Sequence, residues 1–283
     1  MRIIPSIAQL RDAVHEARKD GRSVGFVPTM GALHEGHLSL IRKAASENHL
    51  VVVSIFVNPK QFESQGDLDA YPRDEAADAT LAAQAGAAIV FTPTATALYP
   101  AGFTTMVRVD GPLTQTLEGE HRGRRHFEGV TTVVAKLLNI VAADTAYFGQ
   151  KDAQQALVVQ RMVRDLDMPV RIAVCPTVRD ADGLALSSRN VRLTAAARER
   201  ALAIPRALEC AEALVASGVR ASDQIVAAAQ AELRRSGIEP EYLTLVTTDT
   251  LLPIPSLSGA GLLAIAAEID GVRLIDNVIL AAR

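Results

Sequence analysis

Two histidines, His34 and His37, lie three residues apart in the stretch PTMGALHEGH, where an apolar segment gives way to an amphipathic one. If a helix begins near Gly36, His37 lies in its first turn, where free backbone N–H groups and the helix dipole favour an anion. Gly31 and Gly36 leave room for a phosphate or a nucleobase close to the backbone. The pattern predicts that both imidazoles donate hydrogen bonds to phosphate oxygens. A capping histidine beside a surface histidine is the alternative, and zinc is disfavoured because H-x-x-H lacks a third ligand.

Two further segments have side chains suited to phosphate. Lys151 and Asp152, in FGQKDAQQ, are expected to follow a strand and open a helix, where a lysine can neutralise a phosphate as a point charge. The segment SSRN (187–190) supplies two hydroxyls and a guanidinium, which suit a polyphosphate. The alternatives without a ligand are a solvated Lys–Asp pair and a plain turn before a helix that Thr194 caps.

Three glutamines, Gln61, Gln154 and Gln155, carry neutral amides that can bind hydroxyls and a carboxylate. Glutamine is common on protein surfaces, so each of the three is a weak signal when taken alone. We keep them as candidate contacts to a small polar substrate.

Two charged segments have less specific patterns. HRGRRHF (121–127) predicts an exposed loop at the rim of a site or, as the preferred interpretation, a solvated run of charge. Four carboxylates surround YPR (71–73), and they could include a Mg²⁺ contact, although most are expected at helix starts: Asp67, Asp69, Asp74 and Asp78.

The elements that must position these residues alternate along the first part of the chain. Short β-branched runs predict strands at 23–29, 50–58, 87–92, 145–149 and 170–175, and helical patterns fall between them at 36–48, 74–86, 129–143 and 152–166. This alternation predicts an α/β fold, a Rossmann-like parallel sheet with helices on both faces. Ligands of such sheets bind outside the carboxyl ends of the strands, where the polar segments lie.

The pattern changes after Pro176. Two Ala-rich helices are expected near 194–217 and 221–236, and three strands follow near 242–247, 261–269 and 272–280. We therefore expect a catalytic domain over 1–176 and a smaller α+β C-terminal domain over 177–283 that covers the site.

Composition excludes several classes of protein. The chain has 283 residues, a formal charge of −3 and two cysteines. This charge argues against nucleic acid as a partner, and two cysteines are too few for a disulfide framework. The N-terminus lacks the apolar run of a signal peptide, and no segment reaches the length of a membrane span. We expect a cytoplasmic protein with no membrane partner.

Seven segments together resemble the pantoate–β-alanine ligase family, the pantothenate synthetases. They run in the family's order from residue 28 to residue 277: PTMGALHEGH, VVSIFVNPKQF, YPR, EGVTTVVAKLLN, FGQKDAQQ, DGLALSSRN and RLIDN. HEGH alone is typical of the wider nucleotidyltransferase superfamily, whereas its combination with IFVNPKQF and LSSRN is specific.

The resemblance implies a reaction and its participants. Members condense (R)-pantoate with β-alanine at the expense of ATP, through a pantoyl adenylate, and release pantothenate, AMP and pyrophosphate. It also implies a homodimer and Mg²⁺, which should bridge phosphate oxygens with few protein ligands. The protein ligands of that metal are unknown at this stage.

The resemblance also implies the site residues. His37 stands at the position of the proton donor, with His34 and Lys151 as further catalytic residues. Gln61 matches the contact to pantoate and β-alanine, and Gln155 a second contact to pantoate. The ATP contacts match Met30, Gly31, Ala32, Leu33, His34, Glu35, Gly36, His37, Gly149, Gln150, Lys151, Asp152, Val178, Leu186, Ser187, Ser188 and Arg189.

The sequence departs from the family pattern in two places. Gln150 stands where many relatives have glutamate, and HRGRRHF is longer and more basic than usual, so no role passes to Arg122, Arg124 or Arg125. Two other classes stay open, an adenylyltransferase that leaves AMP on its product and a non-catalytic nucleotide-binding module. An aminoacyl-tRNA synthetase is disfavoured by the acidic balance and by the lack of room for a tRNA-binding domain.

Overall fold

The computed structural model describes residues 1–62 and 65–282, except for the side chain of Asp67. The chain forms two compact units. The first comprises Met1–Gly149 and Gln154–Pro176, and the second comprises Gln150–Ala153 and the chain from Thr177 onward. The short segment Gln150–Ala153 therefore groups with the C-terminal residues, although it lies between two elements of the first unit.

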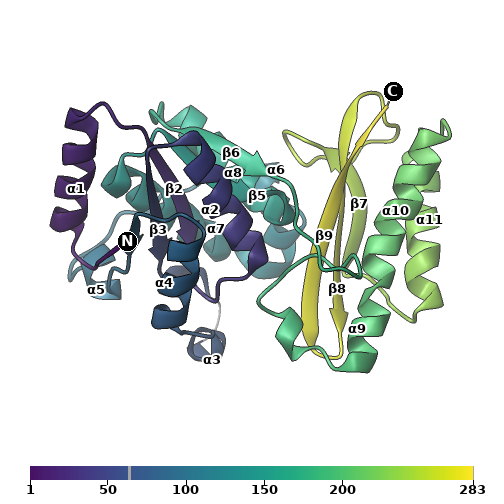
Figure 1. The fold of residues 1–283 in the computed structure, drawn as a ribbon. Coiled ribbons are helices and arrows are strands. Elements are labelled where there is room, and N and C mark those ends of the chain that lie inside the picture. The colour runs from purple at the N-terminus through teal and green to yellow at the C-terminus, as the bar shows by residue number, and fades with distance from the viewer. Residues whose placement is uncertain (63–64, 283) are drawn as a thin grey trace. The chain divides into compact units, whose positions relative to one another are not determined.

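A six-stranded parallel sheet forms the centre of the first unit (Figure 1). Its strands, in the order β1-β4-β3-β2-β5-β6, are β1 (Arg2–Ile4), β4 (Ile89–Phe91), β3 (Leu50–Ile55), β2 (Val24–Thr29), β5 (Thr145–Gly149) and β6 (Arg171–Cys175). The predicted parallel α/β fold is confirmed. Strand β1 was not expected, and β3 ends at Ile55 rather than at residue 58.

Helices cover both faces of this sheet (Figure 1). Because side chains alternate along a strand, Phe26 and Val52 point to one face while Val27 and Val53 point to the other. The first face packs against α1 (Ile7–Lys19), α7 (Glu118–Val141) and α8 (Ala153–Asp165), and the second against α2 (Glu35–Glu47) and α4 (Glu75–Gln84). Both faces are buried, which explains the nearly continuous apolar strands.

The strand order reverses between β2 and β5. From β2 the chain proceeds through β3 to β4 on one side, and from β5 it proceeds to β6 on the other side. In open parallel sheets such a reversal separates the loops at the carboxyl ends of the two strands and creates a place for a ligand. The loop after β2 carries His34 and His37, so the histidine segment begins at this point of the sheet.

Helix α7 contains the basic segment 121–127, so the alternative of a loop there was wrong. The helix is kinked at Gly123, whose φ of 70° and ψ of 165° are not helical. Arg124 and Arg125 are exposed, as expected of a solvated run of charge, whereas Phe127 is buried. Residues 121–126 are polar or glycine and show no apolar period, so the sequence did not predict this part of the helix. The buried apolar side of α7 begins at Phe127.

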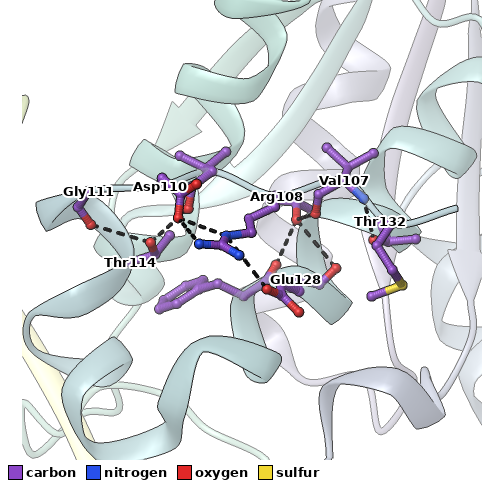
Figure 2. Close-up of polar contacts among 11 residues, drawn as sticks. Val107, Arg108, Asp110, Gly111, Thr114, Glu128 and Thr132 are labelled. Carbon is purple, nitrogen blue, oxygen red and sulfur yellow. Dashed lines mark hydrogen bonds and ion pairs between the residues drawn. The ribbon is translucent and has the colours of Figure 1, made fainter.

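An extended segment is fastened along α7 by polar contacts (Figure 2). The N–H of Val107 donates to the hydroxyl of Thr132 at 3.0 Å, and its carbonyl accepts from Thr131 at 2.6 Å. Arg108 forms an ion pair with Asp110 at 2.6 Å and lies 3.8 Å from Glu128. These contacts hold the middle of α7, which in turn braces part of the candidate site.

The second unit has an antiparallel sheet in the order β7-β8-β9. Its elements are α9 (Ala195–Ala201), α10 (Ala203–Ala216), α11 (Ser222–Arg235), β7 (Tyr242–Thr247), β8 (Ala260–Ile269) and β9 (Val272–Ala281). The expected α+β composition is confirmed, although the single helix expected at 194–217 is two helices that meet at Leu202. Helices α10 and α11 pack their apolar sides against the sheet.

Short elements complete the two units. They are α3 (Gln65–Ala70), α5 (Ala95–Leu98) and α6 (Pro112–Gln115), with 3₁₀ turns η1 (Pro59–Gln61), η2 (Gln150–Asp152) and η3 (Asn190–Arg192). Among the described residues, no helix has both the length and the apolar character needed to span a bilayer.

Candidate active site

The loop after β2 has a backbone shape that depends on glycine. Gly31 has a φ of +84°, and a Cβ there would lie 2.8 Å from a carboxylate oxygen of Asp78. Ala32 follows with a φ of 51°, also in the left-handed region. In a turn, successive backbone N–H groups can point at one anion.

The anion that this turn holds is the carboxylate of Asp78. Its two oxygens accept the N–H groups of Ala32 at 2.8 Å and Leu33 at 2.7 Å. Asp78 projects from α4 and is 4% exposed. A buried carboxylate that accepts two backbone N–H groups stabilises one conformation of the loop, the conformation that leads into His34.

His34 and His37 cap helix α2 reciprocally. His34 is the N-cap, and its Nδ1 accepts the N–H of Gly36 at 3.2 Å, while Nδ1 of His37 accepts the N–H of His34 at 3.4 Å. The ring centroids lie 4.2 Å apart. Because Nδ1 acts as the acceptor in both rings, the neutral tautomer carries its proton on Nε2. Each ring therefore has an Nε2–H donor at a helix N-terminus, so capping and phosphate binding are compatible roles.

The structure brings Gln61 next to Met30. The Nε2 atom of Gln61 lies 2.9 Å from the sulfur of Met30, and its Oε1 accepts from Nδ2 of Asn58 at 3.0 Å. Gln61 ends the 3₁₀ turn η1, which Asn58 caps through the N–H of Lys60. The turn explains why β3 stops before residue 58: the chain must leave the sheet to present the amide.

Helix α7 braces this turn. Asn58 is 1% exposed and donates to the carbonyl of Gly129 at 3.1 Å, while its Oδ1 accepts from the hydroxyl of Tyr99 at 2.8 Å. A Cβ at Gly129 would lie 2.3 Å from the carbonyl oxygen of Lys60, so only glycine permits this approach. Nδ1 of His126 donates to the carbonyl of Gln61 at 3.0 Å. Asn58 and His126 were not assigned roles from the sequence, yet both position Gln61.

The two neighbouring glutamines of α8 differ in their surroundings. Gln154 is buried, donates to the carbonyls of Leu113 and Thr116 at 2.8 Å, and accepts the N–H of Glu118 at 2.9 Å. These bonds occupy its amide, so Gln154 holds the segment before α7 and was a wrong candidate for a substrate contact. Gln155 is half-buried.

A cavity of about 230 Å³ adjoins the histidine loop in the first unit. Its wall includes Met30 and Gly31 from the loop, Phe56 and Val57 past the end of β3, and Asp78. The cavity lies at the carboxyl ends of the strands, where ligands of open parallel sheets bind.

In the second unit, Lys151 lies in the turn η2 rather than in the first turn of α8. Its side chain is 17% exposed, and Nζ lies 3.9 Å from a carboxylate oxygen of Asp152, at the far limit of an ion pair. The carbonyls of Gln150 and Lys151 accept hydrogen bonds from Asn277 at 3.0 and 2.9 Å. The lysine is therefore held by its backbone and only weakly neutralised.

The segment that ends in SSRN begins as a small hairpin. Val178 accepts the N–H of Leu186 at 3.0 Å, and Arg179 pairs with Ala185 across the two arms. Beyond the hairpin, the hydroxyl of Ser187 accepts the N–H of Arg189 at 3.2 Å. The predicted residues 186–189 thus form a turn, with their side chains half-buried.

The carboxylates around YPR do not assemble into a metal site in the part of the chain that the structure describes. Asp74 caps α4, Asp69 accepts from Gln65 at 2.8 Å, and Asp78 binds the histidine loop. The side chain of Asp67 lies outside the described part. No group of three or more His, Cys, Asp or Glu side chains that could hold a metal ion occurs among the described residues.

Comparison with known proteins identifies close relatives. The sequence matches the family described as pantoate-beta-alanine ligase over residues 2–279. It is 51% identical to a pantothenate synthetase of Cereibacter sphaeroides over 277 residues, 98% of each chain. A crystal structure of pantothenate synthetase from Thermus thermophilus matches with a TM-score of 0.93 and 44% identity, over 98% of this chain and 99% of that one.

A second solved structure carries ligands. The pantoate-beta-alanine ligase of Francisella tularensis, complexed with beta-gamma ATP and beta-alanine, matches with a TM-score of 0.81 and 35% identity. The match covers 99% of this chain and 97% of that one.

Proposed function

The chain belongs to the pantoate–β-alanine ligase family, and from that membership we propose how its residues carry out the reaction. The reaction is the ATP-dependent condensation of (R)-pantoate with β-alanine, which yields pantothenate, AMP and pyrophosphate through a pantoyl adenylate. One observation supports the roles above all others: the reciprocal capping of His34 and His37 at the end of β2. It fixes two Nε2–H donors where the sheet reverses its strand order.

In the first half-reaction, a carboxylate oxygen of pantoate attacks the α-phosphorus of ATP. A bond forms between these two atoms, the bond from the α-phosphorus to the bridging oxygen breaks, and pyrophosphate leaves with the electron pair. Negative charge grows on the phosphate oxygens in the transition state, and preorganised N–H donors stabilise it. His34 and His37 supply such donors, and His37, at the position of the family's proton donor, directs its Nε2–H at the departing group.

In the second half-reaction, the amine of β-alanine attacks the acyl carbon of the adenylate. The new C–N bond replaces the bond to AMP, which leaves as a phosphate anion, and the amine loses a proton. The Gln61 amide binds pantoate and β-alanine, and Gln155 binds pantoate. The bond from Asn58 to Gln61 orients that amide before substrate arrives.

The ATP contacts that we propose follow the family resemblance. In the first unit these are Gly149 and the loop from Met30 to His37. In the second unit, Lys151 neutralises phosphate charge as a point cation. The remaining contacts of the second unit come from Gln150, Asp152, Val178, Leu186, Ser187, Ser188 and Arg189.

Mg²⁺ is proposed as a companion of ATP rather than as a metal caged by protein. The described residues offer no cluster of metal-ligating side chains, and both oxygens of Asp78 already accept backbone N–H groups. This donor set fits an ion held mainly by phosphate oxygens and water. When bound there, Mg²⁺ would offset the charge of the triphosphate.

Two further proposals concern the assembly and the compartment. The family resemblance supports a homodimer, which light scattering tests by a molar mass twice that of the chain. Cys175 and Cys210 are both free thiols, which supports a reducing compartment such as the cytoplasm. Fractionation of cells would contradict this if the protein appeared outside the cytoplasm.

A purified-enzyme assay tests the function directly. With ATP, pantoate, β-alanine and Mg²⁺ present, pantothenate, AMP and pyrophosphate should form in equal amounts, and omission of any one substrate should abolish pantothenate. An adenylylated final product in place of free AMP would contradict the assignment, as would ATP turnover that needs no pantoate.

A further inference from the structure

Asn277 makes an unusual set of contacts for a residue of a terminal strand. It lies in the middle of β9, opposite Ala264 of β8, and is 5% exposed. Its Nδ2 donates to the carbonyls of Gln150 and Lys151 at 3.0 and 2.9 Å, and its Oδ1 accepts from Nε2 of Gln150 at 3.0 Å. One amide thus uses both donors and its acceptor on two consecutive residues of the same unit.

The turn that receives these bonds needs them. The turn η2 has only three residues, Gln150–Asp152, and 3₁₀ turns have poorer internal hydrogen bonds than α-helices. Gln150 and Lys151 are half-buried, and Asn277 gives the carbonyl of each a hydrogen-bond partner. A planar amide with two donors and one acceptor fixes the orientation of the peptide units as well as their position.

Asp276 fixes Asn277 in turn. Its carboxylate accepts the N–H of Asn277 at 2.8 Å and forms a two-pronged ion pair with Arg179, at 2.6 and 3.1 Å. The side chain of Asp276 is 1% exposed and that of Arg179 is 32% exposed, so the carboxylate is the buried partner of this ion pair. Arg179 belongs to the hairpin that leads to residues 186–189. The pair 276–277 therefore ties together the two segments of the second unit to which we assign ATP contacts.

From these contacts we infer that Asn277 is a positioning residue for Lys151 in adenylate formation. It touches no reacting atom, and it acts by holding the backbone from which the Lys151 side chain extends. The inference rests on the proposed role of Lys151. It assigns a task to the RLIDN segment, for which the sequence suggested none.

Single-turnover adenylation, measured with pantoate and saturating ATP, gives the first test. Asn277→Ala and Asn277→Ser should slow this step by about 10- to 100-fold, the scale of a small misplacement of a reacting group. More ATP should not restore the rate, because the loss lies in orientation. Asn139→Ala is the matched control, since Asn139 is exposed and donates within its own helix, to the carbonyl of Ala135 at 2.8 Å. Circular dichroism and thermal unfolding confirm that each variant is folded, and a normal rate in folded Asn277→Ser overturns the inference.

A double-mutant cycle separates positioning from general support of the fold. If Asn277 acts through Lys151, adding Asn277→Ala to Lys151→Ala should slow adenylation by no more than about twofold, because coupled residues are not additive. A further 10- to 100-fold loss would show an independent effect and overturn the inference. If Lys151→Ala slows adenylation and Asn277→Ala does not, only the positioning role fails. If Lys151→Ala is itself as fast as the unmodified enzyme, the role of Lys151 in the proposed function fails first.

Discussion

The carboxylate of Asp78 accepts the backbone N–H of Leu33 at 2.7 Å, and this bond fixes the loop that precedes His34. Asp78→Asn replaces one oxygen with an NH₂ group that faces a backbone N–H. We expect unfolding free energy to fall by about 1–3 kcal/mol, the usual effect of leaving a buried donor unpaired. Adenylation should slow by about 10- to 100-fold because the loop loses its shape. Chemical denaturation and single-turnover kinetics measure the two effects.

Asp74→Asn is the control for that substitution. Asp74 lies on the same helix, where it caps the N-terminus through the N–H of Ala77 at 3.0 Å, and asparagine caps about as well as aspartate. Stability and adenylation should both stay close to normal. If Asp74→Asn and Asp78→Asn lose the same amount of stability and of adenylation rate, Asp78 has no specific role in holding the loop.

Capping and chemistry at the two histidines can be separated by choice of replacement. His34→Asn retains a good N-cap, and His37→Gln retains a side chain able to bond back to the N-cap, but neither keeps an imidazole Nε2–H. Both variants should therefore unfold at nearly normal temperature and yet lose adenylation by about 10²- to 10³-fold, while binding of pantoate is largely kept. His34→Ala should lose about 1 kcal/mol of stability in addition.

Calorimetric titration with pantoate measures whether each variant still binds that substrate. If either variant retained adenylation and lost only affinity for β-alanine, the histidines would not face the phosphates. If the variants lost stability but kept the normal rate of adenylation, the two histidines would act only as caps of α2.

The fold was predictable where one pattern dominates. Strands such as β2 and β3 are buried on both faces, so their apolar runs stand out, and α2 shows its periodicity clearly. Strand β1 has three residues and did not stand out, while α9 and α10 share one Ala-rich pattern across the bend at Leu202. Pro205 was the local signal for this break that we did not use, because a proline has no N–H to bond the carbonyl of Ala201 four residues earlier.

The candidate site was predictable as a set of segments, but not as a network. His34 and His37 stand out because imidazoles at a helix start are uncommon, whereas Asp78 looks like any carboxylate of a helix start. The available signal was its place beside the buried Ala79 and Ala82 on the apolar side of α4. Asn277 belongs to the matching segment RLIDN, but its role could not be predicted, because its partners lie 126 and 127 residues away.

Lys151→Ala should slow adenylation by about 10²- to 10³-fold, because one preorganised electrostatic partner is lost. The sequence suggested an exposed lysine whose loss would leave packing intact, but the side chain is 17% exposed and its stem is largely buried. Lys151→Met, which retains the apolar stem, therefore separates charge from packing. If Lys151→Ala and Lys151→Met slow adenylation equally, the loss comes from the missing charge. Near-normal single-turnover adenylation in Lys151→Met would refute the role of that charge.

The buried hydroxyl of Tyr147 links stability to acid pH. Lys43 and then Tyr147, which hydrogen-bond to Glu47 at 2.8 and 2.6 Å, lower the pKa of that carboxyl from 4.5 to about 2. Because the folded-state pKa is the lower one, the network stabilises the protein above about pH 4.5 and loses this effect as the pH falls toward 2.

Glu47→Gln should therefore unfold at a lower temperature than the unmodified protein at neutral pH. This gap in unfolding temperature should close near pH 2. Glu16→Gln is the control, since Glu16 pairs with Lys19 on the exposed side of α1 and such pairs contribute little. A gap for Glu47→Gln that stays constant with pH would contradict this linkage.

The order of the chemistry can be tested without β-alanine. If the carboxylate is activated first, enzyme, Mg²⁺, ATP and pantoate should exchange labelled pyrophosphate into ATP, and omission of pantoate should abolish the exchange. Gln155→Glu would place a negative charge near the incoming carboxylate, and at about 4 Å with an effective dielectric near 20 the repulsion is about 4 kcal/mol before screening. This variant should lose exchange mainly through weaker pantoate binding, so a higher pantoate concentration should recover part of it. Gln160→Glu, farther along the same helix, should exchange normally. The exchange requires the pantoyl adenylate, which in this mechanism forms from pantoate and ATP before β-alanine takes part. Exchange without pantoate, or exchange that needs β-alanine, would therefore refute the two-step mechanism.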